Sequence, residues 1–180
     1  VDSELATVAL THYRRRQRLA VATAATVGSM WRELDRGDLA GSWLRTGPRV
    51  TRTLATAQYL AATTSNAYVS AALAVQGVDG DQDGTLIPGS LSGVASDGRV
   101  LSDLVRQPLI GTLDRMSQGM SLSQSLARGR AEMDRIVRTQ VADAGRVGDG
   151  VAGITRRGVD WYVRVLTPPS CSRCAVLAGK

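Results

Sequence analysis

The spacing of apolar residues along the first 76 positions sets the fold class of this chain. Between residues 2 and 31 apolar side chains recur at steps of three and four, as on one face of an amphipathic helix. Residues 48–76 repeat the pattern in a sequence rich in Ala, Thr and Ser, with Pro48 placed for a first helical turn. Residues 35–48 between them are expected to form a short helical turn. We therefore predict a long helical hairpin or arm over residues 1–76.

The rest of the chain alternates breaks with further helical pattern. Residues 77–98 contain six Gly and one Pro, which predicts a loop. Helical spacing returns over residues 99–146, with Pro108 as a kink, a break near Gly119, and Ser121 or Ser123 as a cap. Five Gly over residues 145–158 predict a linker, and residues 147–180 are expected to hold this Gly linker, a strand and a C-x-x-C module. The predicted fold class is mainly α, an elongated bundle of long helices followed by the start of a small strand-plus-Cys module.

The composition predicts a thin core. Hydrophobic residues make up 43% of the chain, but aromatic residues only 4%, and Phe is absent. Ala, Val and Leu must therefore fill most of the interior. Trp31, Trp43 and Trp161 are candidates either for core positions or for anchors on a partner.

The net charge of +6 is compatible with binding to nucleic acid or another anionic surface. The alternative is that the arginines only solvate helix faces. The longest basic run, residues 13–18, has no glycine or aromatic interleaving of the kind that single-strand binders use. Neither a signal peptide nor a membrane span is expected, so the chain is predicted to be soluble, made in the cytosol and without a membrane partner.

Cys171 and Cys174 form the sharpest local motif. Two thiols separated by two residues can hold a zinc ion from one tight turn, and Arg173 beside them favours the thiolate form. The pair supplies half of a tetrahedral site; free thiols and incidental spacing are the alternatives. The chain has no third Cys, and its only histidine, His12, lies far away in the sequence.

An acidic stretch, residues 79–90, matches part of a calcium-binding loop. Asp79, Asp81 and Asp83 occupy the first ligand positions of an EF-hand loop, but the twelfth, which needs a bidentate Glu, falls on Ser90. An acidic turn is the better interpretation.

Catalysis has little support in the sequence. Any Ser/His/Asp or Cys/His arrangement would have to use His12, which lies on the apolar side of a predicted helix, where a packed or partner-facing histidine is expected. No phosphate-binding glycine motif is present. The sequence therefore gives no catalytic constellation, and an enzyme is not expected.

Residues 160–180 carry a family resemblance. "DWYVRVL" alternates in the manner of a strand and leads through "TPPS" to "CSRC" and "LAGK". This ending resembles the minor capsid, or head-morphogenesis, proteins of tailed bacteriophages, the MuF-like group. The resemblance implies that Cys171 and Cys174 open a small C-terminal module, whose His and C-x-C half would follow Lys180. Zinc would then be possible if the chain continues.

The same resemblance implies a function. Such a protein is a structural component of the virion, made in the bacterial host cytoplasm and present in several copies inside the capsid near the portal vertex. The partners that the resemblance implies are the phage portal protein, the capsid interior and packaged DNA, and the implied role is to assist capsid assembly or genome packaging and ejection. A capsid maturation protease, or its processed fragment, is one alternative, since similarly placed gene products carry that label. A basic helical DNA-binding protein is the other.

Overall fold

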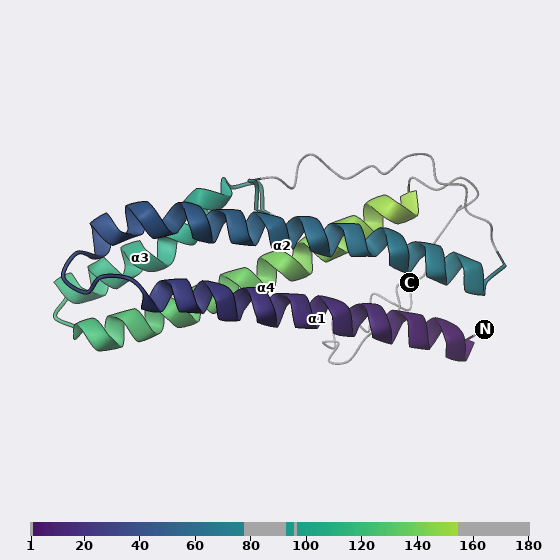
Figure 1. Ribbon diagram of the computed structural model, residues 1–180, viewed down its shortest axis with the longest axis horizontal. Coiled ribbons are helices and arrows are strands. Elements are labelled where there is room, and N and C mark those ends of the chain that lie inside the picture. The colour runs from purple at the N-terminus through teal and green to yellow at the C-terminus, as the bar shows by residue number, and fades with distance from the viewer. Residues whose placement is uncertain (1, 78–92, 96, 155–180) are drawn as a thin grey trace.

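The computed structural model describes residues 2–77, 93–95 and 97–154, and these are mainly helical, as predicted (Figure 1). The first helix, α1, spans Asp2–Arg32, close to the expected 2–31. It is followed by α2 (Leu39–Val75), α3 (Leu101–Ser117) and α4 (Leu122–Ile154). The strand predicted at 160–166 and the C-x-x-C motif lie outside the described residues.

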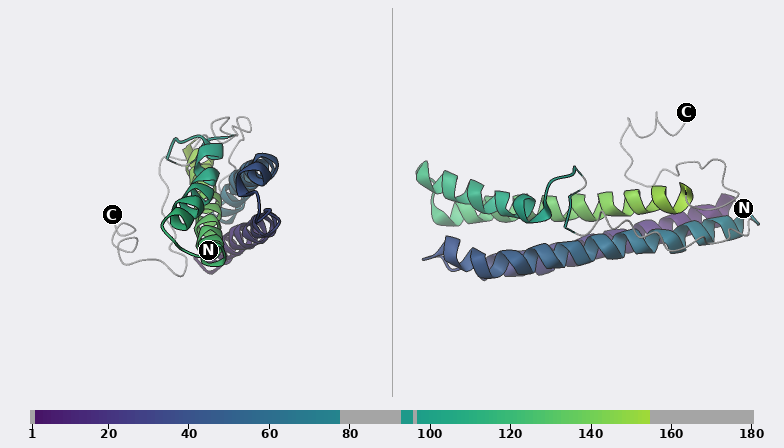
Figure 2. Two further views of the ribbon diagram at one scale, coloured as in Figure 1. Left: turned by 90° about the vertical axis from the view of Figure 1, so that its left-hand side faces the viewer. Right: turned by 90° about the horizontal axis from the view of Figure 1, so that it is seen from above.

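The four helices form an elongated bundle in which α4 packs on all three of the others. Helices α1 and α2 are antiparallel, as are α3 and α4, while α2 and α4 run in the same direction (Figure 1). Because α3 has only 17 residues, it accompanies the bundle over part of its length (Figure 2). We call that part the four-helix part. The opposite portion, the three-helix end, consists of residues 3–16 of α1, 65–75 of α2 and 144–149 of α4.

The apolar core is concentrated in the four-helix part. Its largest fully buried apolar side chains come from every helix: Val27, Leu54, Leu101, Met133 and Val137. Trp31 and Trp43 are also buried, with their rings in edge-to-face contact at 5.9 Å between centroids, and the Trp31 indole donates to the Leu126 carbonyl at 3.1 Å. These two tryptophans are core residues, whereas Trp161 lies outside the described residues.

The start of α2 differs from the expected one. The separate turn predicted over 35–48 is part of α2, which begins at Leu39 because the Asp38 carboxylate caps it by accepting from the Gly41 N–H at 2.8 Å. Pro48 is therefore inside the helix rather than at its start. A proline there removes the hydrogen bond to the carbonyl four residues earlier. That residue, Leu44, is 78% exposed, so water can satisfy its carbonyl.

The second pair of helices follows the sequence signals more closely. Pro108 lies inside α3, and Gly119 ends that segment with a φ of 90°, a left-handed conformation that favours glycine. Ser121 caps α4, its hydroxyl accepting from the Gln124 N–H at 3.3 Å. However, α4 runs on to Ile154, well beyond the point at which a glycine linker was expected.

Candidate functional site

A cluster of polar side chains occupies the interior of the three-helix end. The Asp149 carboxylate of α4 lies 3.1 Å from Nε2 of His12 and accepts from Nη1 of Arg16 at 2.8 Å, so that it joins α4 to α1. The His12 ring stacks on Tyr68 of α2, with ring centroids 4.4 Å apart and planes 10° apart. The Ser65 hydroxyl of α2 also lies near the carboxylate. We call these five residues the Asp149 cluster.

Charge and burial act in opposite directions on Asp149. Burial alone would raise its pKa, but the hydrogen bond from His12 and the positive charge of Arg16 outweigh it and hold the pKa below the ordinary value. Burial and the negative charge of Asp149 together raise the pKa of the Tyr68 phenol, and Arg16 offsets part of that increase. Asp149 is therefore a carboxylate at neutral pH, and since an ionised carboxylate only accepts, His12 donates to it from Nε2.

The order of contacts in the cluster does not suit nucleophilic catalysis. In a serine hydrolase the imidazole stands between the serine and the carboxylate, so that it can take the proton of the nucleophile. Here Asp149 stands between His12 and Ser65. Ser65 is fully buried and donates instead to the Gly145 carbonyl at 3.0 Å, and His12 is only 6% exposed. The arrangement can bind helices together.

Glycines in α4 allow the helices to come close enough for these contacts. A Cβ added at Gly148 would lie 2.8 Å from the Cα and the carbonyl oxygen of Ala62, and one at Gly145 would lie 2.5 Å from Cδ of Arg16. Real Cβ atoms do not make such contacts. The glycines that suggested a linker are therefore helix-packing residues.

The four-helix part contains other buried polar contacts between helices. Gln58 of α2 donates to Gln140 of α4 at 3.2 Å, and Arg115 of α3 donates to Glu132 of α4 at 2.7 Å. The first joins residues 82 positions apart in the sequence and the second joins consecutive helices, and both help to fix the register of α4 against its neighbours.

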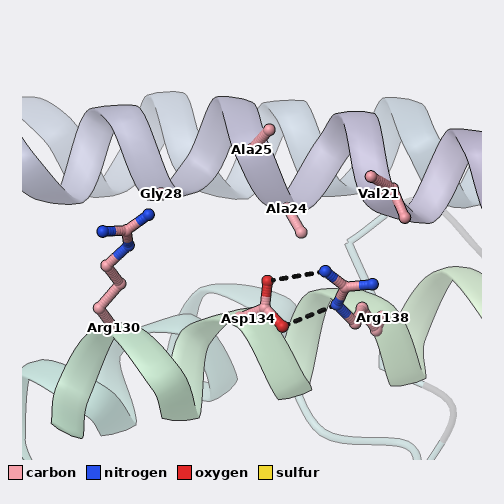
Figure 3. Close-up of a pocket in the computed structure, with 7 residues that line it drawn as sticks. All are labelled: Val21, Ala24, Ala25, Gly28, Arg130, Asp134 and Arg138. Atoms are coloured by element: carbon pink, nitrogen blue, oxygen red, sulfur yellow. Dashed lines mark hydrogen bonds and ion pairs between the residues drawn. The ribbon is translucent and has the colours of Figure 1, made fainter. Parts of the chain in front are cut away.

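A shallow groove of about 230 Å³ lies between α1 and α4 (Figure 3). Its α4 side carries Arg130, which extends beside Gly28, and Asp134, which accepts from Nε of Arg138 at 2.7 Å. The α1 side is apolar, and the full lining is Val21, Ala24, Ala25, Gly28, Arg130, Asp134 and Arg138. Because the Asp134 carboxylate neutralises Arg138, the formal charge that remains in the lining of the groove is that of Arg130.

The outer side of α2 is charged near its start and uncharged over the rest of its length. Arg45, Arg49 and Arg52 are exposed near its start, but residues 53–78 contain no Asp, Glu, Lys or Arg. An exposed helix face normally carries charged residues. Positions on this uncharged side are exposed or half-exposed and follow helical spacing in one stripe, which we call the α2 outer face: Thr56, Tyr59, Leu60, Thr63, Ala67, Ser70 and Ala74. It extends over about 27 Å, at 1.5 Å per residue.

The motifs singled out in the sequence fall mostly outside the described part. Cys171 and Cys174, the proposed zinc half-site, and the acidic stretch 79–90 all do so. Within residues 2–77, 93–95 and 97–154, no three His, Cys, Asp or Glu side chains gather as a metal site would require. In that same part, none of the helices combines the length and apolarity needed to cross a membrane.

Neither protein-family models, curated proteins nor solved structures gave a match to this chain. The fold and the sites together define a class no finer than an elongated helical bundle with a polar interior cluster at one end.

Proposed function

We propose that this chain is a structural minor capsid protein of a tailed phage, which binds the portal inside the head and assists assembly or genome handling. Its mechanism is recognition through a helix surface rather than reaction. The resemblance of residues 160–180 to MuF-like proteins supplies the biological setting of this proposal.

The observation that carries the proposal is the α2 outer face. It is a solvent-exposed helix stripe in a chain of net charge +6, yet it contains no charged residue over its whole length. Tyr59 and Leu60 on this face are 48% and 44% exposed. Exposed apolar surface in a regular, uncharged strip is typical of a region that another protein covers. The partner that we propose for this strip is the portal ring.

The experiment is co-purification of the chain with the portal protein of the phage that encodes it. Ala67→Arg places a charge in the middle of the α2 outer face and should reduce portal binding at least tenfold. The matched control is Ala22→Arg, the same change at an exposed position of α1, which should bind as the wild type does. If the wild type fails to bind portal, or if both variants bind equally well, this function is wrong.

DNA binding remains a second candidate because of one cluster on α1. Arg14, Arg15 and Arg18 are exposed, and within the described residues none of them makes an ion pair. Each phosphate that such residues neutralise contributes about −0.9 to the slope of log affinity against log salt. Duplex-DNA retention that falls steeply between 50 and 200 mM salt, roughly by that slope, would favour this candidate, and retention independent of salt would remove it.

A further inference from the structure

The three-helix end has a different kind of interior from the four-helix part. Before Val27, the buried side chains of α1 are His12 and a few small residues: Ala9, Ala20, Thr23 and Ala24. Beyond Ala62, the only buried described side chain of α2 is Ser65. Apolar burial contributes in proportion to area, about 25 cal/mol per Å². The N-terminal segment, residues 3–16, is therefore held only weakly by apolar contacts.

Polar contacts attach the N-terminal segment to the bundle where the apolar core ends. The N-terminal segment reaches α4 through the bonds from His12 and Arg16 to Asp149, at 3.1 and 2.8 Å, and reaches α2 through the stack of His12 on Tyr68. All of these contacts depend on a single carboxylate or on the histidine it orients. Their loss would leave residues 3–16 attached mainly by alanine contacts and by partly buried Leu5 and Val8.

We propose that residues 3–16 of α1 form a segment that opens locally from the bundle while the four-helix part stays folded, and that the Asp149 cluster is the latch that keeps this segment closed. Opening uncovers the α4 surface at Gly145, against which Arg16 of the closed segment lies. Local opening of this kind is expected wherever a structural unit has few buried apolar contacts of its own. The inference is independent of the proposed portal binding.

The latch depends on the ionised form of Asp149. The groups that face it are His12 and Arg16 from α1 and Ser65 and Tyr68 from α2, while Arg146 and Asp143 on its own helix pair with each other at 3.2 Å. Protonation of the carboxylate removes the acceptor that both α1 donors share. The latch is therefore closed at neutral pH and weakens only as the pH falls through the folded-state pKa of Asp149.

Hydrogen exchange read by mass spectrometry tests the proposal. In the wild type at neutral pH, peptides from residues 3–16 should exchange at least tenfold faster than peptides from 101–113 and 133–141, after correction for intrinsic rates. Asp149→Asn should speed exchange in 3–16 by a further ten- to hundredfold and leave the two core peptides within about twofold. Asp143→Asn, the same chemical change on the same helix outside the cluster, should leave all three regions within about twofold.

Two results would overturn the proposal. The first is that residues 3–16 of the wild type are protected from hydrogen exchange as strongly as the core peptides are. This result would mean that the bundle opens only as a whole, and it can be obtained without any variant. The other is equal acceleration of all regions by Asp149→Asn. If Asp149→Asn fails to fold, Arg16→Met serves instead, because it keeps the aliphatic stem against Gly145 and removes only the charge and the donor.

Discussion

Alanine in place of Gly148 should destabilise this protein, although a glycine-to-alanine change inside a helix ordinarily stabilises. The new Cβ would lie 2.8 Å from the Cα and the carbonyl oxygen of Ala62, and 2.9 Å from Oγ of Ser65. The first two are backbone atoms of α2, so no side-chain rotation can relieve the contact. Either α4 and α2 move apart or the helix distorts, and moving apart also stretches the 3.0 Å bond from Ser65 to the Gly145 carbonyl.

The magnitude follows from two opposing terms. Forcing extra atoms into a packed interior costs about 1–3 kcal/mol, and the backbone contacts at this site place the cost in the upper half of that range. The higher helix propensity of alanine returns about 0.8–1.0 kcal/mol. The net loss should be about 1–2 kcal/mol, which lowers Tm by roughly 2–8 °C for a chain of this size.

Gly28 provides the matched control. A Cβ there would meet only the Arg130 guanidinium, at 3.5 Å from Nε, which is ordinary contact with a flexible side chain. Gly28→Ala should therefore stabilise by up to about 1 kcal/mol. Thermal and urea unfolding of both variants, followed by circular dichroism at neutral pH, should give shifts of opposite sign. If Gly148→Ala is as stable as Gly28→Ala, then α2 and α4 are not as close as described and the packing argument fails.

Two further predictions concern stability and pH. Leu54→Ala removes a fully buried side chain and should lower the free energy of unfolding, measured in urea, by about 2–5 kcal/mol. Leu44→Ala, at a site 78% exposed, should change it by no more than about 0.5 kcal/mol. Equal losses in the two variants would contradict the assigned core. Because the pKa of Asp149 is held below its ordinary value, its contribution to stability is present above a pH of about 3.9 and is lost as the pH falls through the lower folded-state value. The wild type should therefore lose stability on acidification below about pH 4 more steeply than Asp149→Asn, and parallel acid profiles would exclude that role for the carboxylate.

Helix existence could be predicted from the sequence because local signals coincide with the real boundaries. The three- and four-residue spacing of α1 predicted its end to within a residue. Gly119 and Ser121 mark the α3–α4 break because one adopts a left-handed conformation and the other caps a helix. The mainly α class follows from such signals alone.

The predicted boundaries were wrong for two reasons, a local helix cap and tertiary contacts that outweigh local preference. Pro48 looked like a helix start, but the Asp38 cap begins α2 earlier. Gly145 and Gly148 looked like a linker, since each disfavours a helix by about 1 kcal/mol relative to alanine. Glycine stands at these helical positions because Arg16 and Ala62 occupy the space that a side chain there would need. Both of these residues are far away in the sequence.

The sequence predicted only one part of the Asp149 cluster. His12 was expected to be packed or to face a partner, and it is packed. Its partner Asp149, 137 residues later, lies among the glycines that suggested a linker. One signal could have pointed to it: His12 and Arg16 are four residues apart on the inward side of one helix, and an inward arginine requires an acid.

Close packing and charge at the three-helix end depend on one another. The glycines that let α4 approach its neighbours leave no room for Leu or Val between the helices, so apolar volume cannot fix the alignment of α1 there. The Asp149 cluster can, because a slip of α1 by one turn would carry both His12 and Arg16 about 5.4 Å along α4, so that at most one of the two donors would still reach the carboxylate. An apolar seam of alanines would tolerate such a slip at little cost. We therefore infer that this buried ionic cluster specifies helix register as well as holding the segment closed, a role in which polar interior groups are best attested.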